Sequence, residues 1–322
     1  MTAAEAARRA FDAKTKPRGS LGRLEELGVQ IAEIAGSPDP GPLRAAIVVA
    51  AGDHGVAAEG VSAYPAEVTR QMLANFEAGG AAVCVLARAA GAALRVLDAG
   101  VGEPTENIAN GPAMSREDAS AWIDRGVGIA EELAAEGFGI VGLGEMGIGN
   151  STVAAALTAA LAGVDPAAVC GPGTGLDEAG VAHKAEVVRR ALAANSVDPS
   201  DPVGVLAALG GFELAALCGV ALGAAGNRIV VVLDGFISSA AAFVAARMQP
   251  AALAAMIAAH RSPEPGHSVV LDALGLEPVL DLELRLGEGS GAALCVPILN
   301  ASLAILREMA TFEAAGVTDA GR

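Results

Sequence analysis

Aromatic residues are scarce in this chain of 322 residues, which holds seven Phe, one Trp and one Tyr. Hydrophobic residues still make up 53% of the sequence, so the core must be built from Ala, Val, Leu and Ile. Small apolar side chains suit helices that pack closely on a sheet. Gly (41) and Pro (16) are more frequent than usual but follow no fixed period, which excludes collagen-like and disordered low-complexity proteins.

Basic residues are also few, because 21 Lys and Arg stand against 37 Asp and Glu and leave a formal net charge of −16. A field of this sign repels phosphate backbones and anionic lipid surfaces. We therefore expect neither nucleic acid nor a membrane as a partner. A small phosphorylated ligand remains compatible with this charge, because one lysine and a few backbone N–H groups can hold a single phosphate locally.

Closely spaced cysteine pairs are lacking as well, and we expect no secretory signal. No CxxC spacing suggests zinc or a redox pair, and we expect buried free thiols in a reducing cytoplasm at Cys84, Cys170, Cys218 and Cys295. The charged N-terminus has no apolar segment of the kind found in secretory signals. The longest uncharged run, between Glu288 and Arg307, is predicted to form a buried loop and helix rather than a membrane segment.

Short β-branched runs alternate with long Ala-rich helical patterns, which is typical of a parallel sheet covered by helices on both faces. Four runs are uninterrupted, as expected of strands buried on both faces: Ala46–Ala50, Leu94–Leu97, Gly139–Val141 and Ile229–Leu233. Two weaker strands are predicted at Ala168–Cys170 and Ser268–Leu271. The fold class expected is a three-layer, doubly wound α/β protein with a mostly parallel sheet.

Helices are predicted between these strands, at Gly22–Ala35, Pro65–Ala78, Ala81–Ala90, Arg116–Ala135, Ser151–Ala162, Asp177–Ala194, Pro202–Ala224, Ser238–Met248 and Leu299–Ala314. The length fits two domains or one large α/β unit. No linker divides the chain, so we predict a main Rossmann-like domain over residues 41–285. Residues 1–40 and 286–322 would fold together into a smaller helical domain that completes the active site.

One glycine-rich segment follows a predicted strand and leads into a helix. It matches G-x-G-x-x-G at Gly142, Gly144 and Gly147. Free N–H groups at a helix start favour a phosphate there. A dinucleotide site also needs an acid at the end of a second strand, and Asp165 lies in a turn instead. Three interpretations stay open: a site for another phosphorylated ligand, a dinucleotide site, and a turn whose glycines serve only packing.

A second glycine-rich turn runs from Gly171 to Gly175 and precedes a helix that carries Lys184. The two turns could converge on one ligand. Taken alone, a lysine in the position of Lys184 is more often a solvated residue of the helix surface than a phosphate ligand.

Two glutamates sit among glycines beside apolar sequence, Glu145 in the first glycine-rich segment and Glu288 in Leu286–Gly291. Loss of hydration raises the pKa of such a carboxyl, as a general base working near neutral pH requires. The alternative for Glu288 is an acid that interacts with the dipole of the helix that follows.

The loop after the first predicted strand contains Asp53 and His54. A metal site or a catalytic triad is one interpretation, but no Gly-x-Ser-x-Gly elbow or second His at ligand spacing supports it. Structural hydrogen bonding by these two residues is favoured. The other histidines, His183, His260 and His267, form no HExxH or similar cluster.

Together and in this order, the motifs resemble the family of nicotinate-nucleotide:dimethylbenzimidazole phosphoribosyltransferases, which act in assembly of the lower ligand of cobalamin. Eight segments along nearly the whole chain carry the resemblance: Lys16–Gly22, Gly52–Val56, Gly144–Asn150, Gly171–Gly175, Leu233–Phe236, His260–Ser262, Leu286–Gly289 and Glu308–Phe312.

The resemblance implies transfer of phosphoribose from nicotinate mononucleotide to 5,6-dimethylbenzimidazole, without a metal or other cofactor, giving α-ribazole 5′-phosphate and nicotinate. By similarity, Glu288 is the general base and Glu145 supports it near the reacting centre. The implied phosphate and nucleotide ligands are Gly147, Lys184 and Ser262, with the nearby turn residues Gly171, Gly173, Thr174 and Gly175. The implied base pocket comprises Ser62, Tyr64, Gln71 and Leu286.

Members of this family are usually homodimers, so the resemblance also implies a homodimer. Two rival functions remain in view. One is a nicotinamide-dependent dehydrogenase that uses Gly142, Gly144 and Gly147, and the other is a catalytically silent protein that binds the nucleotide.

Overall fold

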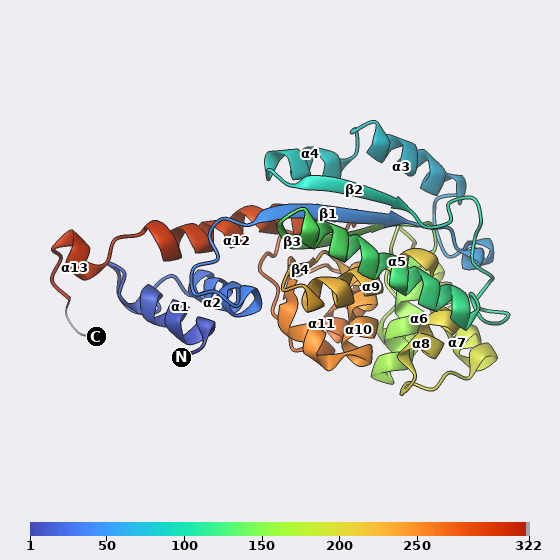
Figure 1. Cartoon of the computed structure of the whole chain (residues 1–322). Coiled ribbons are helices and arrows are strands. Elements are labelled where there is room, and N and C mark those ends of the chain that lie inside the picture. The colour runs from blue at the N-terminus through green and yellow to red at the C-terminus, as the bar shows by residue number, and fades with distance from the viewer. Residues whose placement is uncertain (320–322) are drawn as a thin grey trace.

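A parallel five-stranded sheet forms the centre of the computed structural model, which describes residues 1–319 (Figure 1). The strand order is β2-β1-β3-β4-β5, and every neighbouring pair is parallel. The strands are β1 (Arg44–Ala51), β2 (Ala93–Asp98), β3 (Phe138–Met146), β4 (Val230–Leu233) and β5 (Met256–Ala258). This confirms the expected doubly wound α/β class.

Thirteen α-helices and three short 3₁₀ helices lie in the described part of the chain. The α-helices are α1 (Ala3–Asp12), α2 (Arg23–Ala35), α3 (Glu67–Glu77), α4 (Ala82–Ala89), α5 (Arg116–Ala135), α6 (Asn150–Ala162), α7 (Glu178–Asn195), α8 (Pro202–Leu209), α9 (Phe212–Gly226), α10 (Phe236–Met248), α11 (Pro265–Leu274), α12 (Ser290–Glu308) and α13 (Phe312–Ala315). The 3₁₀ helices are η1 (Gly55–Glu59), η2 (Pro166–Ala168) and η3 (Pro250–Ala255).

Strands β1, β3 and β4 are buried on both faces, which explains their uninterrupted apolar runs. The same burial predicted for Leu94–Leu97 is wrong, because β2 lies at the edge of the sheet and exposes Arg95. Successive side chains of β1 point to opposite faces. Ile47 and Val49 join a core cluster with α2, α4 and α12, whereas Val48 and Ala50 join the larger cluster with α5, α6, α8, α9 and α10. Figure 1 shows α3 and α4 above the sheet and α5, α6, α8, α9 and α10 below it.

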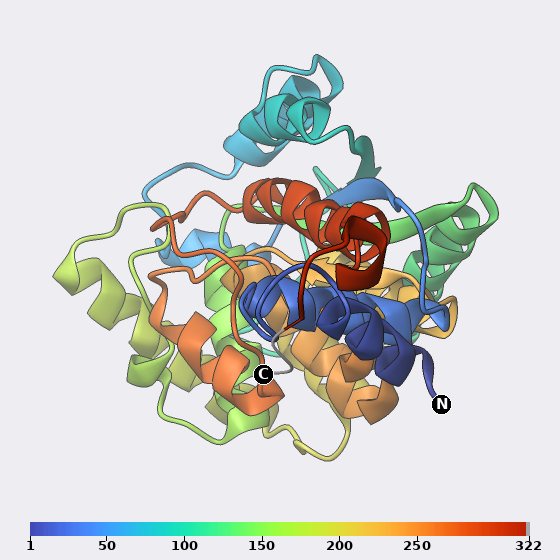
Figure 2. The ribbon, with the colours of Figure 1, turned by 90° about the vertical axis from the view of Figure 1, so that its left-hand side faces the viewer.

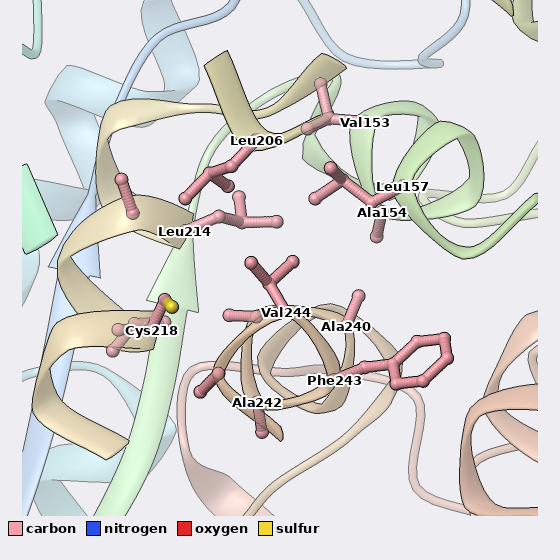
Figure 3. Close-up of a cluster of buried hydrophobic side chains, with 14 of the residues drawn as sticks. Val153, Ala154, Leu157, Leu206, Leu214, Cys218, Ala240, Ala242, Phe243 and Val244 are labelled. Carbon is pink, nitrogen blue, oxygen red and sulfur yellow. The ribbon is translucent and has the colours of Figure 1, made fainter. Parts of the chain in front are cut away.

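Small side chains set the spacing of the larger helical layer. Figure 3 shows Ala154, Ala240 and Ala242 interleaved with branched residues between α6, α8, α9 and α10. Helices α5 and α9 approach most closely at Gly126 and Gly219, where a side chain on either glycine would collide with backbone atoms of the other helix. The low aromatic content therefore reflects a core of closely packed helices.

The two chain ends lie together beside the sheet (Figures 1 and 2). Phe11 of α1, Val29 of α2 and Leu306 of α12 share a small apolar cluster. The ammonium group of Lys14 also donates to the carbonyl of Met309 (2.7 Å). Helices α2 and α12 pack on the sheet as well, so the division at residues 40 and 285 stays a prediction.

Both weaker strand predictions are wrong. Ala168–Cys170 overlaps the end of η2, and Ser268–Leu271 lies inside α11. Pro166 and Pro265 stand at the first positions of these helices, where the fixed φ of proline favours a helical turn. The fifth strand is instead the three-residue β5, which is too short to give a periodic signal.

Two helix predictions also differ from the structure, and one helix was not predicted. Pro202–Ala224 divides into α8 and α9, because Gly210 and Gly211 adopt extended backbone. The helix predicted at Leu299–Ala314 begins nine residues earlier, after Gly289, and α13 follows it separately. Helix α1 was not predicted, although Thr2 and Glu5 form a capping box at its start.

Two stretches, Glu67–Ala89 and Ser290–Glu308, are long and apolar enough to cross a membrane by length and composition alone. The first is divided into α3 and α4 around Gly79. The second is α12, whose apolar side packs on the sheet. Each of the four cysteines is buried and free in the described chain.

Candidate active site

A cavity of about 280 Å³ opens at the carboxyl ends of the central strands. Its walls come from the β3–α6 turn, the turn at Gly173, the start of α10 and two loops that precede α11 and α12. Strand order reverses between β1 and β3. Ligands of open α/β sheets bind in the crevice beside such a reversal, so this cavity is the candidate site.

The β3–α6 turn approaches the β1 loop very closely. A Cβ on Gly147 would lie 2.5 Å from the carbonyl oxygen of Gly52 and 3.0 Å from Nε2 of His54. Only glycine fits here, which explains part of the glycine motif by packing. Gly147 and Ser151 nevertheless line the cavity, so packing and ligand binding use the same turn.

Glu145 lies at the end of β3, where its side chain is buried and lines the cavity. Burial raises its pKa to about 8, and the nearby charges of Asp234, Glu213 and Glu288 act in the same direction. The side-chain amide of Asn150 donates to Oε2 of Glu145 and opposes the rise. At neutral pH this carboxyl therefore holds a proton for most of the time.

Glu288 stands between Gly287 and Gly289 with a left-handed backbone (φ 63°). Its side chain is buried, and Oε2 finds no hydrogen-bond partner among residues 1–319. Burial raises its pKa, which the backbone amide of Val83 opposes. Glu288 is not among the residues that line the cavity, whereas its neighbours Leu286 and Gly287 are.

Asp234 connects the turn that contains Glu288 to the end of β4 by hydrogen bonds. Its Oδ1 accepts N–H bonds from Gly291 (2.6 Å) and Ala292 (3.1 Å), and its Oδ2 accepts one from Gly289 (3.0 Å). Burial raises the pKa of Asp234, whereas His260 and these amides lower it. The sequence shows Asp234 within a family motif but gives no sign that it caps α12.

Lys184 extends from α7 into the protein with only 1% of its surface exposed, so the alternative of a solvated lysine is wrong. Its ammonium group donates to the carbonyl of Gly171 (3.0 Å) and to the hydroxyl of Ser151 (3.2 Å). Burial lowers the pKa of Lys184, and the charge of Glu264 opposes that change. The lysine thus links the two glycine-rich turns.

Glu264 is a cavity residue that the sequence did not reveal. Its Oε1 accepts the N–H of Gly173 (2.9 Å), and its buried Oε2 has no hydrogen-bond partner in the described chain. Ser262 also lines the cavity, and its hydroxyl accepts the N–H of Glu264 (3.3 Å). The only signal was the position of Glu264 before Pro265, at a helix start.

Residues predicted for the base pocket are spread along one side of the site. Tyr64 and Leu286 line the cavity. Ser62 is not among the cavity residues, but its hydroxyl is hydrogen-bonded to that of Thr174 (2.9 Å), which lines the cavity. Gln71 is exposed on α3 and is not among the cavity residues, and neither Gly171 nor Gly175 lines the cavity.

The loop at Asp53 and His54 forms structural hydrogen bonds. His54 Nε2 lies 2.8 Å from Oε1 of the buried Glu213, and Oδ2 of Asp53 accepts the N–H of Gly102 (2.7 Å). Within residues 1–319, no group of three or more His, Cys, Asp or Glu is arranged to hold a metal ion. Asp165 lies in a surface turn and pairs with Arg189, away from any strand end.

Comparison with known proteins agrees with this geometry. The profile of a family described as Phosphoribosyltransferase matches residues 1–317. Proteins named nicotinate-nucleotide–dimethylbenzimidazole phosphoribosyltransferase from Geotalea uraniireducens (strain Rf4) and Desulforudis audaxviator (strain MP104C) are 50% and 49% identical to this chain. The alignments cover 96% and 99% of this chain and 92% and 94% of those proteins.

The crystal structure of CobT from Thermus thermophilus is similar throughout, with a TM-score of 0.94 and 47% identity over 98% of this chain and 99% of that chain. A second structure from the same organism, titled as the nicotinate-nucleotide–dimethylbenzimidazole enzyme, gives a TM-score of 0.93 at 46% identity and covers 98% of each chain. The chain therefore belongs to the family of nicotinate-nucleotide–dimethylbenzimidazole phosphoribosyltransferases.

Proposed function

We propose that the protein transfers phosphoribose from nicotinate mononucleotide to 5,6-dimethylbenzimidazole. The observation that carries this proposal is the arrangement around one cavity. Glu145, a carboxyl of raised pKa, lines the cavity, and Glu288, whose pKa is also raised, directly follows the cavity residue Gly287. A buried lysine, Lys184, is hydrogen-bonded to the two glycine-rich turns, which also contribute to the cavity wall. The proposed acid–base residue Glu145 and the proposed phosphate ligand Ser262 thus line the same cavity.

The phosphate end of the site comprises Lys184, Ser262, Glu264 and the turn Gly171–Gly175, together with Gly147. In an acidic protein, a phosphate needs a local cation and local donors. Lys184 supplies the charge, and Ser262 and the amides near Gly147 supply donors. We assign the 5′-phosphate of the nucleotide to this end.

The base end comprises Tyr64 and Leu286, with Ser62 and Gln71 on the adjoining segment. Tyr64 and Leu286 are 56% and 57% exposed, which is unusual for large apolar side chains. A flat bicyclic base between them would remove much of this apolar surface from water. We assign the benzimidazole to this end.

The reaction needs a base for one proton. One ring nitrogen of the benzimidazole attacks C1′ of the ribose, and the C1′–N bond to nicotinate breaks with its electron pair going to the nicotinate nitrogen. The N–H proton of the other benzimidazole nitrogen then passes to a carboxylate. Glu288 fits this role because its Oε2 has no hydrogen-bond partner in the described chain, whereas Glu145 already holds a proton at neutral pH.

The positive charge of the donor pyridinium makes nicotinate a good leaving group, so this scheme requires no metal or other cofactor. Glu145 supports it by keeping a neutral, hydrogen-bonding group beside the carboxylate of Glu288. The positive charge that develops on the attacking azole is stabilised by the negative charge of the Glu288 carboxylate.

We also propose that the protein is a cytoplasmic homodimer. Its four buried free thiols support a reducing compartment. The homodimer is proposed from membership of the family alone.

Incubation of the purified protein with nicotinate mononucleotide and 5,6-dimethylbenzimidazole, without added metal, tests the reaction. Chromatography should detect nicotinate and α-ribazole 5′-phosphate in equal amounts. Binding of the nucleotide without either product would contradict the transfer and favour a silent nucleotide-binding protein. A larger rise of Tm with NAD(H) than with nicotinate mononucleotide would favour a dehydrogenase.

A further inference from the structure

A buried histidine holds the loop that carries Ser262. His267 lies in the first turn of α11 and is fully buried. Its Nδ1 accepts the backbone N–H of Ser262 (3.0 Å), and its Nε2 lies 3.1 Å from the hydroxyl of Ser239 on α10. One imidazole thus connects two helices to a cavity residue.

These contacts define the tautomer of the ring. A backbone amide can only donate a hydrogen bond, so Nδ1 must carry a lone pair and Nε2 must carry the hydrogen. Burial lowers the pKa of His267 to about 3, and His260 and Arg261 act in the same direction. The ring is therefore neutral at neutral pH, and its Nδ1 is an acceptor there.

The orientation of the Ser262 hydroxyl follows from this arrangement. The backbone N–H of Ser262 donates to Nδ1 of His267, and the Oγ of Ser262 accepts the N–H of Glu264. The hydroxyl hydrogen is left to donate, and Ser262 lines the cavity. A hydroxyl held in this way presents a donor, rather than an acceptor, to an anionic ligand.

We infer that His267 is a positioning residue for the substrate phosphate: its Nδ1 fixes the Ser262 backbone so that the Ser262 hydroxyl donates to that phosphate. This inference rests on the proposed function, which places the 5′-phosphate beside Ser262. It assigns His267 an effect on nucleotide affinity and none on the chemical step.

Two amide substitutions separate this role from a purely structural one. In His267→Asn the side-chain oxygen can occupy the position of Nδ1 and keep the Ser262 bond. In His267→Gln the longer amide reaches the position of Nε2, keeps the Ser239 contact and loses the bond to Ser262. Both variants remove the ring and bury one neutral amide, so they form a matched pair.

Calorimetric titration of each variant with nicotinate mononucleotide and with nicotinate riboside, which lacks the phosphate, is the test. We expect His267→Gln to raise the Kd of the mononucleotide roughly tenfold, the scale of one hydrogen bond to a charged group. The Kd of the riboside should change less than about twofold, and His267→Asn should keep the mononucleotide Kd within about threefold of the original. The kcat at saturating substrates should stay the same in both variants.

The inference would be overturned in favour of a structural role if His267→Gln lost equal affinity for the mononucleotide and the riboside. It would also be overturned if the two variants lost equal affinity for the mononucleotide. Ser262→Ala provides the link to the proposed function. If Ser262→Ala weakens mononucleotide binding and His267→Gln does not, the positioning role alone is wrong. If Ser262→Ala leaves the Kd unchanged, the phosphate assignment is wrong and the positioning role fails with it.

Discussion

The two ends of the cavity differ in how much of each is built before a substrate arrives. At the phosphate end, Lys184, Ser262 and Glu264 are buried and joined to neighbouring loops by hydrogen bonds. At the base end, Tyr64 and Leu286 leave more than half of their surface in water. A preorganised end loses little conformational entropy on binding, whereas an open end must be ordered by what it binds.

This difference assigns separate tasks to the two ends. The phosphate end should fix the affinity for the nucleotide donor, which is the same in every turnover. The base end should tolerate some variation in the acceptor, because apolar contact is not directional. Substitutions at each end, and at the carboxyls between them, should therefore affect different kinetic constants.

The largest effect is expected between the two ends. Glu288→Gln removes the proton acceptor and keeps the size of the side chain, so turnover should fall by at least ~10²-fold, the lower limit for a general base. The Kd for nicotinate mononucleotide should not change, since neither end is altered. Steady-state kinetics and calorimetry test both statements, and a turnover close to that of the original protein would remove Glu288 from this role.

At the phosphate end, Lys184→Met should raise the KM for nicotinate mononucleotide by roughly 10- to 100-fold, the range for hydrogen bonds to charged groups. The KM for the base should change little. Arg189→Met on the same helix is the matched control, because that cation is on the surface and pairs with Asp165. An unchanged nucleotide KM in Lys184→Met would show that the buried lysine holds only the two turns.

The carboxyl of Glu145 should make stability depend on pH. Its pKa is about 8 in the folded protein, well above the usual value near 4.3 in an unfolded chain. The protonated form therefore stabilises the fold fully below about pH 4, and this contribution is lost as the pH rises towards 8. The slope should reach at most ~1.4 kcal/mol per pH unit between these limits.

Urea unfolding at several pH values between 5 and 8 measures this slope. Glu145→Gln cannot ionise, so its free energy of unfolding should fall less steeply with rising pH than that of the original protein. Parallel pH profiles for the two proteins would mean that Glu145 is ionised in the folded state. Glu186→Gln, at an exposed site on α7, is the control and should leave the slope unchanged.

Local sequence patterns predicted the strands that carry the site better than they predicted the hydrogen bonds within the site. Strands β1, β3 and β4 were predicted because β-branched runs buried on both faces are visible without any partner. Local patterns also singled out Glu288 and Lys184 as candidates, whereas the resemblance to a family assigned their roles and supplied Ser262.

Contacts between distant segments could not be predicted from local patterns. The bond from Gly173 to Glu264 spans 91 residues, and the pair of His54 and Glu213 spans 159. In neither pair does one residue lie in a periodic or turn pattern that would identify the other residue as its partner. His267 was visible as a histidine without a cluster, and only the packing of α10 on α11 gives it a role.

The smallest effect is expected at the base end, where Leu286→Ala shortens an exposed side chain. Each buried methylene group contributes about 0.8 kcal/mol, and only part of the leucine side chain can be covered by the base, so the KM for dimethylbenzimidazole should rise roughly fivefold. The Kd for nicotinate mononucleotide should not change, in contrast to Lys184→Met. Because Leu286 is exposed before the base binds, the free energy of unfolding should stay within about 0.5 kcal/mol of the original value. If the nucleotide Kd rose as much as the base KM, the two ends would form one continuous subsite, and the separation of tasks drawn from their burial would be wrong.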